Sequence, residues 1–268
     1  MTQANVHQAI DNAVTLASQA APLWAEASVQ VRARLLRGLA QVLEAHQADL
    51  VAIADEESHL GAGRLNSEVA RTAFQLRGFA EQVEAGAAHG KVADEAIAGA
   101  PPAGRPQLTR VLRPLGPVAK CSASNFPFAF SVLGGDAASV LAAGCPVVVK
   151  AHSGHPRLSV AVYELARQVL VDQGLPEGLI TMVEGASRGA GGYLVQHPSR
   201  QSRLIPPPST HPITKGRRGI DVSRRRLHIA PTDIGHQVLS APLVATGPGG
   251  KTAAQRMSRV AFSVNPTA

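Results

Sequence analysis

Cysteine is scarce in this chain, which has only Cys121 and Cys145 among its 268 residues. Disulfide-stapled proteins are short and cysteine-rich, and both of these cysteines lie in apolar, strand-like segments, so a disulfide framework is not expected. Such cysteine usage is typical of the reducing cytoplasm. Aromatic residues are also scarce, at 3% of the chain. We therefore expect a core built mainly from alanine, valine and leucine.

Long apolar runs are missing as well. A membrane-spanning helix needs about 18 or more apolar residues in a row, and the sequence contains no such stretch, so no membrane span is expected. The N-terminus lacks a basic segment followed by an apolar run, so no secretory signal peptide is predicted. We expect a cytoplasmic protein.

Acidic residues are almost absent from the C-terminal part of the chain. Residues 198–268 hold 11 Lys and Arg against two acids, whereas residues 1–197 hold 15 Lys and Arg against 17 acids. The net charge of +7 therefore belongs to the tail. The tail also lacks helical or strand periodicity, so we predict that residues 199–268 are irregular and disordered.

The rest of the chain carries regular patterns. Apolar residues recur at helical spacing over residues 6–20, 29–58 and 67–86. Residues 87–107 are rich in glycine and proline and predict a loop, and residues 108–114 alternate like an exposed strand. Buried parallel strands are predicted at 117–122, 146–150 and 179–183. A helix is predicted at 157–173.

Two segments concentrate the polar chemistry. Ser122-Ala123-Ser124-Asn125-Phe126-Pro127 places an amide after one apolar strand, and Gly144-Cys145-Pro146-Val147-Val148-Val149-Lys150-Ala151-His152 places a cation after the next. A helix-length stretch, residues 132–143, separates them. This is the order of a βαβ unit, whose ligand lies at the carboxyl ends of the strands.

These segments resemble the aldehyde dehydrogenase superfamily, and most closely its NADP-linked dehydrogenases of 2-oxoglutarate semialdehyde (2,5-dioxovalerate). The similarity runs from about Asp55 to Pro198 and includes Val69–Glu81, Val111–Ala119, Ala123–Pro127, Gly134–Asp136, Ala143–Pro146, Val149–His152 and Leu194–Pro198. Family members are about twice as long as this chain. The resemblance implies an α/β fold: an N-terminal helical part over 1–107, an incomplete Rossmann-like parallel sheet over 108–198 that binds NAD(P), and an irregular basic tail over 199–268.

The resemblance also implies a reaction. In the family, a cysteine attacks an aldehyde, hydride passes to the nicotinamide, and a glutamate activates water to release the acid. Asn125 matches the asparagine that stabilises the oxyanion, a role that an amide at a strand end can fill with little reorganisation. The structural alternative is that Asn125 caps the following helix, a position that asparagine favours.

The cofactor implied by the family is NADP or NAD. Lys150 matches the lysine that holds the adenosine ribose, with a solvated strand-end lysine as the alternative. His152 and Ser153 could meet a 2′-phosphate, although His152 could equally be an ordinary loop histidine. Ser122, Ala123 and Ser124 are expected to line the cofactor. The glycine-rich stretch 185–192, including Gly191, could lie beside its phosphates at a helix N-terminus.

The catalytic nucleophile and base are not apparent. Cys121 and Cys145 are rejected as nucleophiles because buried apolar cysteines react slowly. The family's glutamate is also missing. The histidines show no metal-site spacing. Arg71 and Gln75 share a helix face from which Arg77 points away, and Arg71 could read a substrate carboxylate, although a solvated helix face is the commoner role of such residues.

Three readings remain open. The first is a truncated oxidoreductase, inactive alone, whose tail arose by a frameshift: Ser263-Val264-Asn265-Pro266 matches a family segment, with Val260 at the position of the missing glutamate. The second is a non-catalytic nucleotide- or partner-binding remnant. The third is weak nucleic-acid binding by the tail, limited to non-specific attraction because no reading module is present. The family forms homo-oligomers through a C-terminal strand, which this chain lacks.

Overall fold

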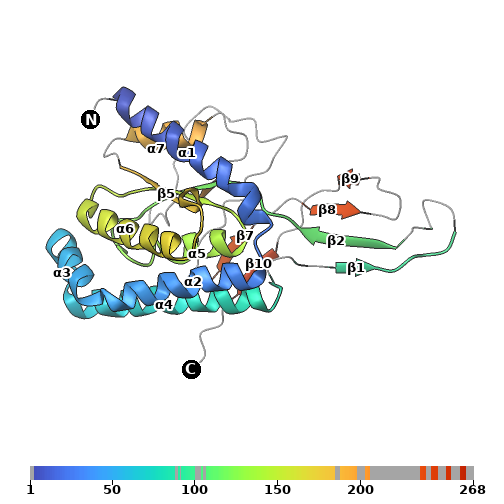
Figure 1. Ribbon diagram of the computed structural model, residues 1–268, viewed down its shortest axis with the longest axis horizontal. Coiled ribbons are helices and arrows are strands. Elements are labelled where there is room, and N and C mark those ends of the chain that lie inside the picture. The colour runs from blue at the N-terminus through green and yellow to red at the C-terminus, as the bar shows by residue number, and fades with distance from the viewer. Residues whose placement is uncertain are drawn as a thin grey trace.

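Four helices form the N-terminal part of the computed structural model, which describes residues 3–87, 90, 92–99, 104, 107–184 and 188–197 and the backbone of five short strands between 203 and 263. They are α1 (Gln3–Ala25), α2 (Val29–Ala45), α3 (Gln47–Ser58) and α4 (Ala62–Glu84) (Figure 1). The Ser28 hydroxyl caps α2 by accepting the Val31 N–H at 3.3 Å. The predicted helix over 29–58 is two helices, α2 and α3, because the chain leaves the helical conformation at His46.

A parallel sheet lies at the centre, in the strand order β5-β4-β3-β6. Its strands are β3 (Val118–Cys121), β4 (Val147–Lys150), β5 (Ile180–Val183) and β6 (Arg203–Ile205). The chain steps outward from β3 through α5 (Gly135–Ala142) to β4, then through α6 (Pro156–Asp172) and the short 3-10 turn Glu177–Leu179 to β5. After α7 (Arg188–Gln196) it continues in β6, on the other side of β3. The strand order therefore reverses at β3, which is the kind of point where α/β sheets bind ligands.

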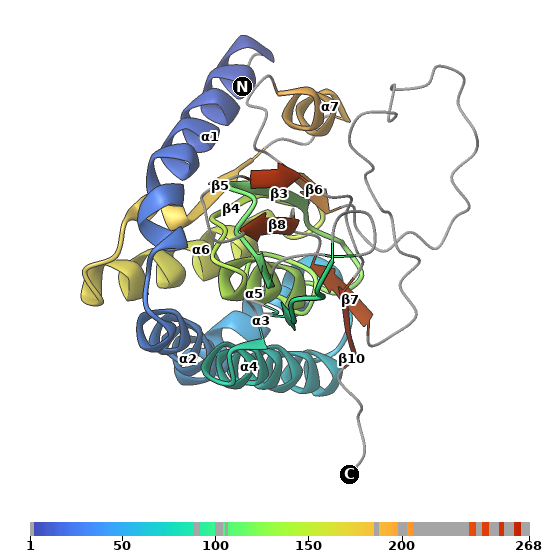
Figure 2. The same ribbon diagram turned by 90° about the vertical axis from the view of Figure 1, so that its right-hand side faces the viewer.

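Helices cover both faces of this sheet (Figure 2). On one face, Val147 and Ile180 pack with the helices α2, α4, α5 and α6. On the other face, Val148 and Val183 pack with α1 and α7. Because neighbouring residues of a strand point to opposite faces, an unbroken apolar strand serves both cores. This explains why the predicted buried strands read as continuous valine-rich runs.

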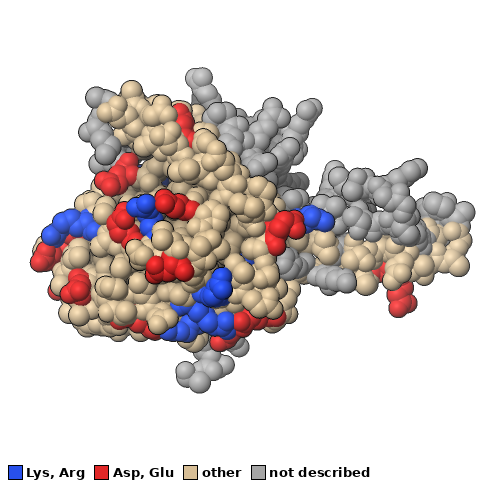
Figure 3. Space-filling view, viewed as in Figure 1, with Lys and Arg blue, Asp and Glu red and all other residues tan. Residues whose placement is uncertain are grey.

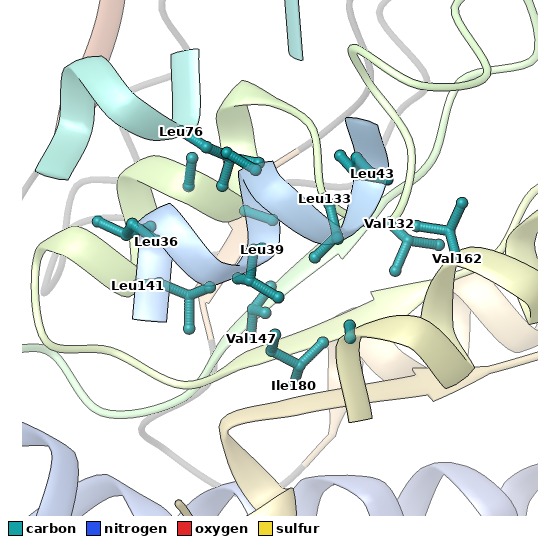
Figure 4. Close-up of a cluster of buried hydrophobic side chains, with 14 of the residues drawn as sticks. Leu36, Leu39, Leu43, Leu76, Val132, Leu133, Leu141, Val147, Val162 and Ile180 are labelled. Atoms are coloured by element: carbon teal, nitrogen blue, oxygen red, sulfur yellow. The ribbon is translucent and has the colours of Figure 1, made fainter. Parts of the chain in front are cut away.

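The larger core is built from small aliphatic side chains, as the composition predicts. Leu36, Leu39 and Leu43 of α2 lie close to Leu76 of α4 and to the sheet (Figure 4). The single tryptophan, Trp24, is 1% exposed and donates its ring N–H to the carbonyl oxygen of Leu141 at 3.0 Å. Among the described residues, no helix has the length and apolar character that a membrane crossing requires.

Antiparallel strands make up the rest of the structure. A second sheet has the order β1-β2-β8-β9, from β1 (Val92–Asp94), β2 (Leu108–Leu112), β8 (Leu243–Thr246) and β9 (Thr252–Ala254), and it projects from the main body (Figure 1). β7 (His236–Leu239) pairs with β10 (Val260–Ser263). The predicted irregular tail thus contains five short strands, β6 to β10, which its sequence periodicity did not indicate.

Charged side chains of both signs are mixed over the surface. In Figure 3, the described Lys and Arg side chains alternate with Asp and Glu and form no broad patch of one sign on that face. Arg37 pairs with Glu84, and Arg157 pairs with Glu56 at 2.8 Å. The arginine side chains proposed for nucleic-acid contacts lie outside the described part: Arg200, Arg203, Arg217, Arg218, Arg224, Arg225 and Arg226.

Candidate functional site

The carboxyl ends of β3 and β4 lie side by side. The ladder between the strands pairs Cys121 with Lys150, and the N–H of Ser122 extends it by donating to the carbonyl oxygen of Lys150 at 3.0 Å. The Lys150 side chain is partly exposed at this edge. The Ser122 hydroxyl is buried and has no hydrogen-bond partner among the described residues. The two sequence segments thus meet where the βαβ order predicts.

The loops that follow the two strands also contact each other. His155 is fully buried, and its Nε2–H donates to the carbonyl oxygen of Ala123 at 2.9 Å. Its Nδ1 lies 3.1 Å from the hydroxyl oxygen of Ser159, which donates its proton to the carbonyl oxygen of His155 at 2.9 Å. A Cβ atom placed on Gly154 would lie 3.4 Å from the Cβ of Ser124. Ala123 and Ser124 are therefore packed directly against the 152–155 loop.

His152 lies in that loop beside Lys150. Its Nδ1 accepts the Gly154 N–H at 2.9 Å, so the neutral ring carries its proton on Nε2. Burial lowers the pKa of His152 below the usual histidine value, and the neighbouring His155 and Lys150 lower it further. Ser153 is exposed. This edge of the sheet therefore gathers ammonium, imidazole and hydroxyl donors, which suit a ribose or a phosphate.

Asn125 is exposed on the turn that follows β3. The next helix, α5, has Gly134 as its N-cap, so Asn125 does not cap it. Instead the turn is held from α4, where the Arg64 guanidinium donates to the carbonyl oxygen of Asn125 and lies 5.1 Å from the ring centre of Phe126. The structural alternative of a helix cap is thereby removed, and the Asn125 amide lies at the surface of the sheet's carboxyl edge.

Glu68, which the sequence analysis did not single out, binds the same turn. One oxygen of its carboxylate, Oε1, accepts the N–H of Phe128 at 2.8 Å and the N–H of Ala129 at 2.9 Å. Burial raises the pKa of Glu68, while the two hydrogen bonds and the nearby Arg64 and Arg71 oppose that rise. A sequence signal existed, because Glu68 is one turn from Arg64 and one turn from Arg71 on the same helix.

Comparison of the sequence with known proteins identifies the family of this chain. The profile of the aldehyde dehydrogenase family matches residues 1–202. The chain belongs to the aldehyde dehydrogenase family. This confirms the predicted resemblance and the predicted α/β fold class with an incomplete sheet of the aldehyde dehydrogenase type.

Individual aldehyde dehydrogenases show how much of the family fold is present. Alpha-ketoglutaric semialdehyde dehydrogenase 2 of Azospirillum brasilense is 39% identical over 193 residues, covering 72% of this chain and 37% of the relative. The corresponding enzyme of Acinetobacter baylyi is 38% identical and is covered to 36%. The crystal structure of an Escherichia coli NADP dependent enzyme matches with a TM-score of 0.61 at 27% identity, covering 72% of this chain and 37% of that one. The chain thus spans little more than a third of these relatives.

The two arginines of α4 that the sequence analysis compared, Arg71 and Arg77, point in different directions. Arg77 points away from the site and pairs with Glu44 of α2. Arg71 is partly buried, and its guanidinium lies 5.6 Å from the ring centre of Phe130, which in turn stands edge-on to Phe126 at 5.3 Å. Arg71 therefore faces the Asn125 turn, and its reading of a substrate carboxylate stays a prediction.

Neither cysteine has the environment of an aldehyde dehydrogenase nucleophile. Cys145 is 3% exposed, and its sulfur accepts the Leu115 N–H at 3.3 Å. Burial raises the pKa of Cys145 and also that of Cys121, so both thiols are disfavoured as thiolates. Within the described part of the chain, no group of three His, Cys, Asp or Glu side chains is placed to hold a metal ion.

The glycine-rich stretch leads into α7, Arg188–Gln196, as predicted, and Gly191 lies in the first turn of that helix. Its place beside the cofactor's phosphates stays a prediction. Residues 185–187 lie outside the described part. At the ends of β3 and β4, the buried Ser122 hydroxyl has no hydrogen-bond partner among the described residues, and Lys150, His152 and Ser153 reach the surface.

Proposed function

We propose that this chain carries the cofactor-binding and oxyanion-binding part of an enzyme that oxidises an aldehyde to its carboxylic acid with NAD(P). The observation that carries the proposal is the position of Asn125 and Lys150, at the carboxyl ends of adjacent parallel strands where the strand order reverses. Family membership over residues 1–202 supports it.

Asn125 acts on the substrate in this proposal. Its side-chain N–H donates to the aldehyde oxygen as negative charge develops there, an interaction whose loss typically costs about 10²–10³ in rate. Lys150 and Ser122 hold the ribose of the cofactor, with Ala123 and Ser124 forming the packed wall beside it. NAD(P), when bound, supplies the hydride acceptor.

The cofactor we favour is NADP, and the substrate we favour is 2-oxoglutarate semialdehyde. His152 and Ser153 lie next to Lys150, where a 2′-phosphate would gain both an imidazole and a hydroxyl donor. The similar E. coli enzyme is described as NADP dependent. For the substrate, the relatives from Azospirillum and Acinetobacter are named for this semialdehyde, and Arg71 offers a guanidinium that suits its carboxylate.

The 268-residue chain by itself is expected to bind nucleotide without turning over substrate. Its two cysteines are disfavoured as thiolates, and Val260 stands where the resemblance of the 263–266 segment implies the family's glutamate. The purified chain should therefore produce no NADPH from 2-oxoglutarate semialdehyde. Substrate-dependent NADPH formation at enzymatic rates would overturn this expectation.

Calorimetric titration with NADP and NAD tests the cofactor site directly. We expect NADP to bind, and Lys150→Ala to weaken it by about tenfold, the effect of losing one charge-assisted hydrogen bond of about 1.4 kcal/mol. Arg167→Ala is the matched control, because it removes an exposed cation of α6 that pairs with Glu164 and Glu177. Equal affinities of the wild type and Lys150→Ala would contradict the proposed site.

A further inference from the structure

One face of α4 contacts the turn that carries Asn125. Arg64, Glu68 and Arg71 succeed each other at four- and three-residue spacing, so they lie on one face of the helix. Each contacts the 125–130 turn: Arg64 through the Asn125 carbonyl and the Phe126 ring, Glu68 through two backbone N–H groups, and Arg71 over the Phe130 ring.

We infer that Glu68 is a positioning residue, whose carboxylate fixes the 125–130 turn and thereby the direction of the Asn125 amide. The inference rests on the proposed function only for the catalytic meaning of Asn125. Glu68 and the turn are about 60 residues apart in sequence, so the contact is a tertiary one that joins the N-terminal helices to the edge of the sheet.

The burial of Glu68 argues for a specific role. The residue is 5% exposed, and one of its oxygens, Oε2, is buried without a partner among the described residues. Burying a carboxylate is costly, and an apolar side chain would fill the same space without that cost. An apolar side chain, however, cannot accept hydrogen bonds, so it could not fix the backbone of Phe128 and Ala129.

The geometry distinguishes positioning from direct catalysis. The oxygen that faces the turn, Oε1, already accepts two N–H bonds, at 2.8 and 2.9 Å. A general base needs an oxygen within reach of the proton that it removes, and this carboxylate is turned toward backbone and is almost completely buried. Glu68 therefore acts on the reaction through Asn125, not on the reacting atoms.

Nuclear magnetic resonance of the ¹⁵N-labelled full chain tests the inference without cofactor or turnover. The amide resonances of Phe128 and Ala129 should follow one common titration with a midpoint above the ordinary glutamate value of 4.5. Glu68→Gln should abolish that titration, and Glu68→Leu, which also removes the acceptor oxygen, should lower the backbone order parameter of Asn125. Glu81→Gln, an exposed glutamate on the same helix, should change neither.

Each other outcome counts against the inference. If the two amides do not titrate together in the wild type, or still do so in Glu68→Gln, Glu68 does not hold the turn. If Asn125 stays equally ordered in Glu68→Leu, the carboxylate supports the fold but does not position the amide. Should Glu68→Leu not fold, Glu68→Asp keeps the charge but shortens its reach, and the common titration should then be lost. A failure of NADP binding would leave these results untouched.

Discussion

We expect His152 to make the choice between NADP and NAD depend on pH. Its pKa lies below the usual value of 6.5 because of burial and the neighbouring His155 and Lys150. A 2′-phosphate beside the ring would raise that pKa, so NADP binding takes up a proton and is favoured as the pH falls toward and below 6.5. NAD, which lacks the phosphate, should show no such trend.

The ratio of NADP to NAD affinity, measured by calorimetry across this pH range, checks the prediction. In His152→Gln the ratio should stay flat, while His46→Gln, which changes an exposed histidine between α2 and α3, should behave like the wild type. A ratio that rises equally in His152→Gln would show that another group, such as the phosphate itself, takes up the proton.

Lys120 destabilises the fold that contains it. The residue is fully buried in β3, where its ammonium donates to the carbonyl oxygen of Ser131. Burial lowers the pKa of Lys120, and the nearby Asp136 opposes this only in part. Replacing a buried ion pair by apolar side chains of similar volume often stabilises a protein by about 1–4 kcal/mol, because the cost of burying charge is removed, and the Lys120 ammonium carries a cost of the same kind. Lys120→Met should therefore raise the free energy of unfolding at neutral pH, by roughly 1 kcal/mol or more.

The pH dependence of that gain has a definite sign. The folded pKa of Lys120 lies below its unfolded value of 10.5, so the unfolded state binds the proton more tightly and wild-type stability rises with pH up to that value. The gain from Lys120→Met should thus shrink as the pH approaches 10.5. Urea denaturation at several pH values measures it, with the exposed Arg34→Met as control. A loss of stability in Lys120→Met would mean that the Ser131 contact outweighs the cost of burial.

Single residues differ in how far the sequence could predict them. The places of Asn125 and Lys150 were predictable from a local signal, because Lys150 ends β4 and Asn125 lies in the turn after β3. For Glu68 the local signal was only its spacing from Arg64 and Arg71, because its partners Phe128 and Ala129 are brought to it by tertiary packing. Lys120 stands out in retrospect as a charge within a predicted buried strand, but the sequence could not show which groups surround it.

At the scale of elements, the sequence patterns predicted which helices and strands are present more accurately than where each begins and ends. The three parallel strands predicted at 117–122, 146–150 and 179–183 are present as β3, β4 and β5. The helix predicted at 29–58 breaks at His46, whose backbone leaves the helical region at φ −108° and ψ 17° while the apolar pattern continues through it. Periodicity reports which face is buried, and it does not register a change of helix direction when both helices face the same core.

Gly144 lies in the connection between α5 and β4, and both its backbone conformation and the atoms around it require glycine at this position. Its φ is +80°, and a Cβ atom there would lie 2.9 Å from Arg32 Nη2 and 2.9 Å from Pro114 Cγ. Gly144→Ala should therefore lower the free energy of unfolding by about 2 kcal/mol, combining left-handed backbone strain with a steric clash. Thermal unfolding of the purified variant measures the effect.

Gly78 provides the opposite case and the control. It lies inside α4, and a Cβ atom there would meet nothing within 4 Å. Gly78→Ala should stabilise the protein by roughly 0.5–1 kcal/mol, because alanine loses less conformational entropy in a helix. If both alanine variants shifted stability in the same direction, the assigned conformation of Gly144 would be wrong.

At the scale of the whole molecule, one core joins the helical part to the sheet. Leu36 and Leu76 of the N-terminal helices share a cluster with Leu141, Val147 and Ile180 of the βαβ region. This cluster crosses the predicted boundary at residue 107, so the two predicted parts are packed as one unit around a common core. Sequence patterns could predict each apolar face but not which faces meet.

The same reasoning predicts where the chain can be cut. Every core residue that the structure describes lies between Val6 and Leu194, yet β3 also pairs with β6 at Arg203–Ile205. A chain ending at residue 206 should therefore keep the thermal midpoint of the full chain within a few degrees. A chain ending at residue 202 loses β6 and exposes the edge of β3 as a row of unpaired backbone groups.

The shorter chain should unfold at a lower temperature and aggregate on heating, which scanning calorimetry and light scattering together detect. The comparison isolates the contribution of β6 to stability, because the chains ending at 206 and 202 differ by four residues and by this one strand. Equal midpoints for these two chains would show that β6 adds nothing to the sheet. A large loss already at residue 206 would instead mean that the remaining tail, in which β8 pairs with β2 and β9 pairs with β8, is part of the stable fold.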